Sequence, residues 1–200
     1  MTHAHIFFDI HSFWHAGSGE GRGGDVDASP LRSRAGLPFL PGRTVKGLFR
    51  EAVQLAEDAD QLPAHTTSAL FGSPAQSAAH NDSAHPSSPG CLSFSDATLG
   101  KDFELWAAAS HNKPCLSGLF HVLSSTRIDK HGMAQDKTLR RIEVAVPMQL
   151  TATVSLIAQP PGHNSWFHVL ATAAPLIRSL GSLRHRGLGR VSVTLRQSES

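Results

Sequence analysis

The chain has 200 residues, of which 40% are hydrophobic and 17% are charged, so it is long enough for one domain with a buried core. Its two cysteines, Cys91 and Cys115, exclude a disulfide framework and a four-cysteine zinc site, and they favour a reducing, cytoplasmic compartment. No stretch reaches the roughly 20 apolar residues of a membrane helix, and no signal peptide is visible. The formal net charge of +2 does not by itself indicate nucleic-acid binding.

The first quarter of the chain predicts a strand, a loop and a helix. Residues 5–14 alternate, with Ile6 and Phe8 on one face and Phe7 on the other, which predicts a strand. Residues 17–24 are rich in glycine and predict a loop. Apolar residues then recur at spacings of three and four from position 45 to 56, which predicts a helix that Thr44 caps.

The rest of the chain predicts more strands, a second helix and long connections. The assignments in chain order are an insert at 73–89, a short strand at 91–95, an extended piece at 118–128, a polar stretch at 129–141, a long strand at 143–157, a helix at 166–180 and a strand at 191–195. Pro147 predicts an edge or a bulge in the long strand, and Pro175 predicts a kink or a start in the second helix. The order is βαββαβ, so we predict a single α+β domain over residues 1–200, with the ferredoxin-like or RNA-recognition-motif (RRM) arrangement and long loops.

Two segments concentrate positive charge. In residues 37–50 a proline-bracketed turn leads into a helix start, where unpaired N–H groups and the helix dipole favour an anion. The charged or hydroxyl side chains at this start are Arg43, Thr44, Lys46 and Arg50. The segment is equally consistent with a phosphate site or with a capped helix whose cations face solvent.

The second basic segment, residues 181–190, combines glycines with cations. Glycines let a backbone approach a ligand closely, and guanidinium groups can bind phosphates or stack on RNA bases. The basic side chains here are Arg184, His185, Arg186 and Arg190. The alternative, a glycine-rich turn with exposed arginines, accounts for the glycines but not for four basic side chains at one turn.

These segments resemble the signatures of the RAMP superfamily of CRISPR-associated proteins. Residues 38–50 (PFLPGRTVKGLFR) resemble the proline-glycine "Ser-x-Lys-Gly-x-x-Arg" signature, and residues 181–191 resemble the C-terminal glycine-rich loop. Three other segments fall into the same order: residues 70–72 (LFG), residues 90–97 (GCLSFSDA), and residues 127–134 (RIDKHGMA) followed by Leu139 and Glu143. The branch that the chain resembles is the type III backbone subunit, which repeats along the crRNA in Csm and Cmr complexes.

The resemblance implies an RRM-like palm with an inserted thumb hairpin at residues 120–145, whose RNA-binding residues would include Arg127, Lys130 and Arg140. It implies that copies of the subunit stack into a filament on the crRNA beside other effector subunits, with no membrane involved. The thumb would wedge between guide and complementary target RNA at regular intervals. Because such subunits hold the guide by its backbone, binding would be largely independent of sequence.

The resemblance also implies a catalytic carboxylate. Catalytic members of this branch carry one Asp in a loop that reads roughly "G-x-x-D-x-P-V-x-R", and residues 24–32 here read GDVDASPLR. Asp27 fits the register best, with one extra residue before Pro30, and Asp25 is the second choice. Such a carboxylate could bind Mg²⁺ or another divalent cation, or orient a 2′-hydroxyl for attack on the adjacent phosphate. The alternative is that both acids are solvated in a flexible loop.

Three functions therefore remain open. The first is a crRNA-binding backbone subunit that also cleaves bound target RNA, as a metal-dependent endoribonuclease. The second is a non-catalytic RNA-binding subunit of the same complex. The third is a stand-alone crRNA-processing endoribonuclease. The 13 histidines include the pairs His11/His15 and His80/His85, but none has carboxylate or cysteine companions at metal-ligand spacing, so no histidine metal site is predicted.

Overall fold

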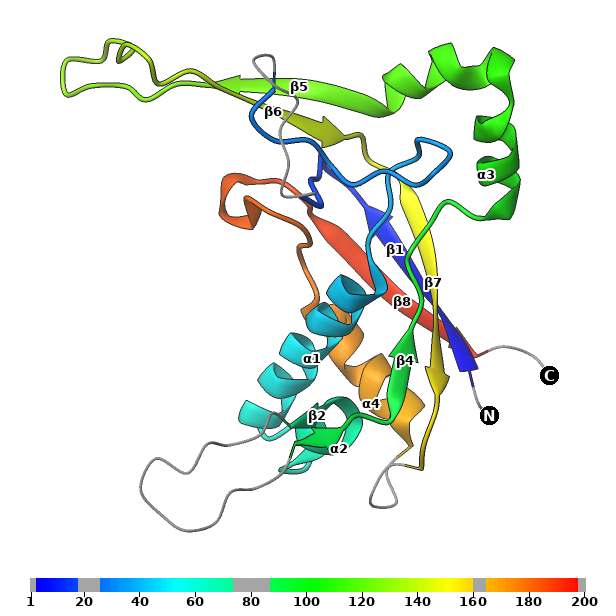
Figure 1. Ribbon diagram of the computed structural model, residues 1–200. Helices are drawn as coiled ribbons and strands as arrows, with labels where there is room; N and C mark the ends of the chain where they lie inside the picture. The colour runs from blue at the N-terminus through cyan, green and yellow to red at the C-terminus, as the bar shows by residue number, and fades with distance from the viewer. Residues whose placement is uncertain (1–2, 18–25, 74–86, 160–164, 198–200) are drawn as a thin grey trace.

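The computed structural model describes residues 3–17, 26–73, 87–159 and 165–197. Its palm is a four-stranded antiparallel sheet in the order β4-β7-β1-β8. The four strands are β1 (His3–Ile10), β4 (Leu92–Phe94), β7 (Gln149–Leu156) and β8 (Val191–Gln197). Helices α1 (Gly42–Asp58) and α4 (Trp166–Ala173) lie on the same side of this sheet (Figure 1). The chain order β1-α1-β4-β7-α4-β8 confirms the predicted α+β, ferredoxin-like fold.

The remaining elements lie outside the four-stranded sheet and its two covering helices. They are α2 (Thr66–Phe71), β2 (Gly72–Ser73), β3 (Ser88–Pro89), α3 (Lys101–Ala108), β5 (Phe120–Ser125), β6 (Arg140–Ala145) and the 3₁₀ segments η1 (Ser110–Leu119), η2 (Ala174–Leu176) and η3 (Arg184–Arg186). Strands β5 and β6 form an antiparallel hairpin that projects from the palm (Figure 1). We call residues 120–145 the thumb hairpin.

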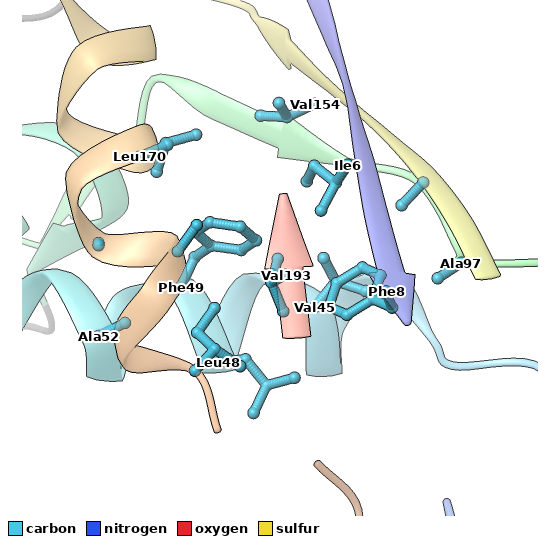
Figure 2. Close-up of a cluster of buried hydrophobic side chains, with 14 of the residues drawn as sticks. Ile6, Phe8, Val45, Leu48, Phe49, Ala52, Ala97, Val154, Leu170 and Val193 are labelled. Carbon is cyan, nitrogen blue, oxygen red and sulfur yellow. The ribbon is translucent and has the colours of Figure 1, made fainter. Parts of the chain in front are cut away.

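The core lies between the sheet and the two helices. Strand β1 buries every second residue, so that Ile6 and Phe8 face the helices while Phe7 stays half-buried on the opposite face. Figure 2 shows Ile6 and Phe8 clustered with Phe49 of α1 and Leu170 of α4. The alternation read from the sequence therefore assigned the two faces of β1 correctly.

Two predicted elements are broken by prolines. The strand predicted over 143–157 is two strands in different sheets: β6 belongs to the thumb hairpin and β7 to the palm. Pro147 lies between them, and its missing N–H cannot join a ladder. The helix predicted over 166–180 ends at Ala173 because Pro175 cannot donate the next helical bond, and only the 3₁₀ turn η2 follows.

Other predicted boundaries also shift. The first strand ends at Ile10 rather than at residue 14, because the segment after it turns away, where Trp14 pairs with Ala145. The first part of the extended piece predicted over 118–128 belongs to η1, and the strand β5 covers only Phe120–Ser125. Helices α2 and α3 were not predicted. Most of the predicted glycine-rich loop, and residues 74–86 of the predicted insert with His80 and His85, lie outside the described residues.

Within the described ranges, no helix is both long enough and apolar enough to cross a membrane.

Candidate nucleic-acid interface

The start of α1 is held by a side chain from another motif. Helix α1 begins at Gly42, two residues before the predicted cap Thr44, and the Gly42 N–H donates to Asp96 Oδ1 at 2.7 Å. Thr44 lies inside the helix and makes no capping bond, so the predicted cap is wrong. Gly42 is needed here because a Cβ would overlap the carbonyl oxygen of Phe94. The carboxylate of Asp96 therefore takes the place at the helix dipole that an anion would occupy.

Any anion bound at the start of α1 would therefore depend on side chains more than on backbone N–H groups. The N–H groups of Thr44 and Val45 donate to the Pro41 carbonyl at 2.8 and 3.0 Å. The cradle of free N–H groups expected from the sequence is thus largely engaged within the protein. The guanidinium of Arg43 remains exposed and can attract a phosphate by itself.

The basic loop at 181–190 is anchored to the segment that follows β1. Gly181, Gly187 and Gly189 have φ of 76°, 80° and 69°, which side-chain-bearing residues rarely adopt. The Gly189 N–H donates to the Phe13 carbonyl at 2.7 Å, and the Ser182 N–H donates to the His15 carbonyl at 2.8 Å. Between these anchors, η3 exposes three consecutive basic side chains to solvent.

A first groove, of about 480 Å³, lies between α1 and this loop. Arg43, Thr44 and Glu51 line it from α1, and Arg184 lines it from η3, with its Nη1 3.4 Å from Glu51 Oε2. Lys46 is not among the described residues that line it. Lys46 is half-buried on α1. Burial raises the pKa of the Cys91 thiol, and the charge of Lys46 opposes this shift. Arg50 is exposed on α1 but is likewise absent from the described lining.

A second groove, of about 550 Å³, lies beside the thumb hairpin where β5 ends and β6 begins. Asp27, Arg127, Arg140 and Arg186 all line it, although they come from four separate stretches of sequence. Asp27 is exposed and pairs with β6: its N–H donates to the Arg141 carbonyl at 2.8 Å, and its Oδ2 accepts from the Arg141 N–H at 2.7 Å. The structure therefore gathers one carboxylate and three arginines in one hollow.

The 3₁₀ turn η3 joins the two grooves. Arg184, at its start, lines the first groove, whereas Arg186, at its end, lines the second. His185 and Arg190 are exposed nearby but are not among the described residues lining either groove. One short turn thus presents cations on both sides, so a chain of phosphates could contact both grooves.

The turn of the thumb hairpin is built by a recognisable local motif. The Asp129 Oδ1 accepts hydrogen bonds from the N–H groups of His131 and Met133, at 2.8 and 3.0 Å, and Gly132 has φ of 82°. This turn exposes large apolar side chains, among them Ile128 and Met133 with 65% and 67% of their surface accessible. Lys130 is exposed on the same turn, away from the described lining of both grooves.

A family comparison identifies the chain. The model described as "RAMP superfamily" matches residues 7–192. The chain belongs to the RAMP superfamily. A comparison with curated proteins found no match.

A solved structure shares the fold of this chain. One similar chain comes from a cryo-EM structure of the type III-B Cmr-beta complex bound to cognate target RNA, with a TM-score of 0.66 and 9% sequence identity. The match covers 98% of this chain and 97% of the other. At such low identity the likeness establishes the fold, so the roles of individual side chains depend on the geometry above.

The donor set of the second groove limits how this RAMP protein could hold a metal. Among the described residues there is no cluster of three histidine, cysteine or carboxylate side chains that could enclose a cation. Asp27 contributes one carboxylate, of which Oδ2 is already hydrogen-bonded. Magnesium often binds through one or two carboxylates together with substrate phosphates and water. Asp27 fits that mode, in which the RNA supplies the other ligands.

The sequence did not predict the residues that connect the Asp27 segment, the thumb hairpin and the basic loop. Arg32 and Glu143 appeared only as letters of two motifs, and His15 appeared only as one of many histidines. In the structure Arg32 Nη2 lies 2.7 Å from Glu143 Oε1, and His15 is buried. Their signal in the sequence was their place in the motifs, whereas their pairing depends on tertiary structure. Asp25 lies outside the described residues.

Proposed function

We propose that this RAMP protein is a crRNA-binding backbone subunit of a type III-like CRISPR effector complex, and that it cleaves bound target RNA in the second groove, beside the thumb hairpin. The observation that carries the proposal is the pair of basic grooves joined by η3, one of which contains Asp27. The similar chain from a type III-B complex bound to target RNA supports this assignment.

In this proposal the first groove holds the guide. Arg43 and Arg184 contact phosphates, and Thr44 adds a hydroxyl donor. Contacts of this kind position an RNA without reading its bases, so any guide sequence would be accepted. The exposed apolar residues of the thumb turn, such as Ile128 and Met133, suit a wedge that separates neighbouring base pairs of the guide–target duplex.

The second groove then receives the target strand where the thumb hairpin distorts it. The Asp27 carboxylate orients the target's 2′-hydroxyl and accepts its proton as the 2′-oxygen forms a bond to the adjacent phosphorus. The bond from phosphorus to the 5′-oxygen breaks and that oxygen takes a proton from water, which leaves a 2′,3′-cyclic phosphate and a 5′-hydroxyl. Arg127 and Arg140 stabilise the negative charge that develops on the phosphate. A bound Mg²⁺ or other divalent cation would supply further charge stabilisation there.

The partners follow from the same arrangement. They are the crRNA, the complementary target RNA, further copies of this chain and the other effector subunits. Helix α3 supports contacts with a neighbouring copy, because Phe103, Leu105 and Trp106 are exposed there and large apolar groups gathered on one surface commonly mark an interface. Repeating copies would place one thumb hairpin, and one cut, at each interval along the target.

A second candidate function has an observation of its own. Asp27 Oδ2 accepts a backbone hydrogen bond from β6, which would be its whole role in a subunit that binds RNA without cleaving it. The third reading, a stand-alone crRNA-processing nuclease, requires the purified protein to cut repeat RNA without partners.

The RNA that co-purifies with the assembled complex tests the proposal. We expect guide RNAs of discrete lengths, and we expect the binding constant to fall steeply with salt because several phosphates are neutralised. Each phosphate contact should contribute about −0.7 to the slope of log K against log salt for single-stranded RNA. RNA of random length, or affinity that does not change with salt, would contradict the proposal. Cleavage of repeat RNA by the isolated protein would favour the processing nuclease.

A further inference from the structure

A partly buried ion pair connects the Asp27 segment to the thumb hairpin. Arg32 Nη2 lies 2.7 Å from Glu143 Oε1, and its guanidinium carbon lies 3.7 Å from the centre of the Phe120 ring. Glu143 belongs to β6 and Phe120 begins β5. The single side chain of Arg32 therefore contacts both strands of the hairpin at its base.

The backbone around this pair sets the position of Asp27. Besides the two hydrogen bonds between Asp27 and Arg141, the Glu143 N–H donates to the Ala28 carbonyl at 2.9 Å, and Ala28 pairs in parallel with Ile142. The paired stretch is short, so its hydrogen bonds alone constrain the segment weakly. Arg32 lies farther along the same segment, and its ion pair with Glu143 adds a side-chain contact between this segment and β6.

Glu143 is also linked to the basic loop. The His15 ring donates from Nδ1 to the Glu143 carbonyl at 2.7 Å, and the His15 carbonyl accepts the Ser182 N–H at 2.8 Å. Both His15 and Glu143 are buried. The links run from Arg32 through Glu143 and His15 to the loop that carries Arg184 and Arg186.

From these contacts we propose that Arg32 and Glu143 are positioning residues, which set Asp27 against the thumb hairpin and the basic loop so that the target is cut at a single phosphate. This inference rests on the proposed function. Its physical basis is that a reacting group displaced by about 1 Å can lose on the order of 100-fold in rate. Neither residue touches RNA in this account; each acts through Asp27.

The test uses Arg32→Met in the assembled complex, with cleavage of complementary RNA followed in single-turnover reactions and product ends mapped to the nucleotide. We expect the rate to fall by roughly 10- to 100-fold, the cuts to spread over neighbouring phosphates, and guide affinity to stay unchanged. Glu143→Gln should give the same pattern more weakly, because an amide can still accept a hydrogen bond from Arg32. Arg32→Lys should restore part of the rate and of the precision, because it keeps the charge.

Glu57→Gln provides a control for loss of stability. The Glu57 carboxylate accepts hydrogen bonds from the N–H groups of His65 and Thr67 and from the Thr67 hydroxyl, at 2.6, 2.9 and 2.7 Å. Burial alone would raise the pKa of Glu57, but these hydrogen bonds outweigh it and lower the pKa below its ordinary value. Removing this charge should destabilise the palm around α2, at the end away from the thumb hairpin (Figure 1), without moving the cut sites.

The outcomes are distinct. If Arg32→Met and Glu57→Gln variants lose rate in proportion to their loss of stability, with cut sites unmoved, Arg32 has only a structural role and the inference is wrong. If the wild-type complex does not cut at all, the proposed function fails instead. In that case amide hydrogen exchange still tests whether Arg32 holds the Asp27 segment against β6. Exchange in residues 26–29 should speed up in Arg32→Met and not in Glu57→Gln. Equal protection in both variants would overturn the inference.

Discussion

Replacing Asp27 with asparagine should lower the single-turnover rate of target RNA cleavage by roughly 100- to 10,000-fold, the usual range for removing a general base. The substitution removes the charge and the proton acceptor. It keeps an oxygen that can accept the Arg141 N–H, as Oδ2 does at 2.7 Å. The position of the segment on β6 is therefore preserved, and the loss reports on chemistry. Gel analysis of end-labelled target in the assembled complex gives the rate.

Two further variants complete this experiment. Asp25→Asn changes the neighbouring acid, the second choice from the sequence, and should leave cleavage intact. Asp27→Ala also removes the hydrogen bond to β6, so any loss beyond that of Asp27→Asn measures positioning. Unchanged cleavage at all sites in Asp27→Asn would remove Asp27 from the chemistry and favour a non-catalytic subunit.

Replacing Gly189 with alanine should weaken guide binding by about 100-fold or more, because the loop at 181–190 could not keep its shape. Gly189 has φ of 69°, and a Cβ there would overlap the Leu180 carbonyl oxygen. Strain of this kind costs about 1–3 kcal/mol before the overlap is counted. Relieving it would break the hydrogen bonds that tie Gly189 to Leu180 and Phe13. Filter binding of a guide RNA to the purified complex gives the affinity.

Gly187→Ala is the matched control for this variant. Gly187 has a similar φ of 80°, but a Cβ there meets no atom within 4 Å. It should therefore cost only the roughly 1–2 kcal/mol of a left-handed residue, with a correspondingly smaller loss of guide affinity. Equal losses of guide affinity would show that the overlap at Gly189 is relieved elsewhere, and no loss in either variant would show that the loop does not hold the guide.

The palm could be predicted because its signals are local. The alternation of Ile6 and Phe8 and the helical spacing after Pro41 each report on one element and its own buried face. The region around Pro147 could not be read in this way, because β6 and β7 continue one alternating pattern although they belong to different sheets. Helix α3 was missed because most of its apolar side chains are exposed and leave no amphipathic pattern.

The candidate site was likewise predictable only in part. Motifs pointed to Asp27, Arg184 and Arg186, but only the fold shows that Asp27 and Arg186 line one groove while Arg184 lines another. Thr44 was mistaken for a cap because the true partner of the helix start, Asp96, lies 54 positions along the chain. Two of the 13 histidines also gain a structural explanation: His15 supports Glu143, and the ring of His121 stacks on Phe13.

Mapping ultraviolet crosslinks between the bound guide and the protein tests the central claim most directly. We expect crosslinked peptides from the start of α1, around Arg43, and from the loop at 181–190, with target RNA crosslinking near Asp27 and the thumb hairpin. An RRM that uses its sheet to stack bases would instead crosslink through the open face of β1, where His5 and Phe7 lie. Crosslinks confined to that face would contradict this account of both grooves.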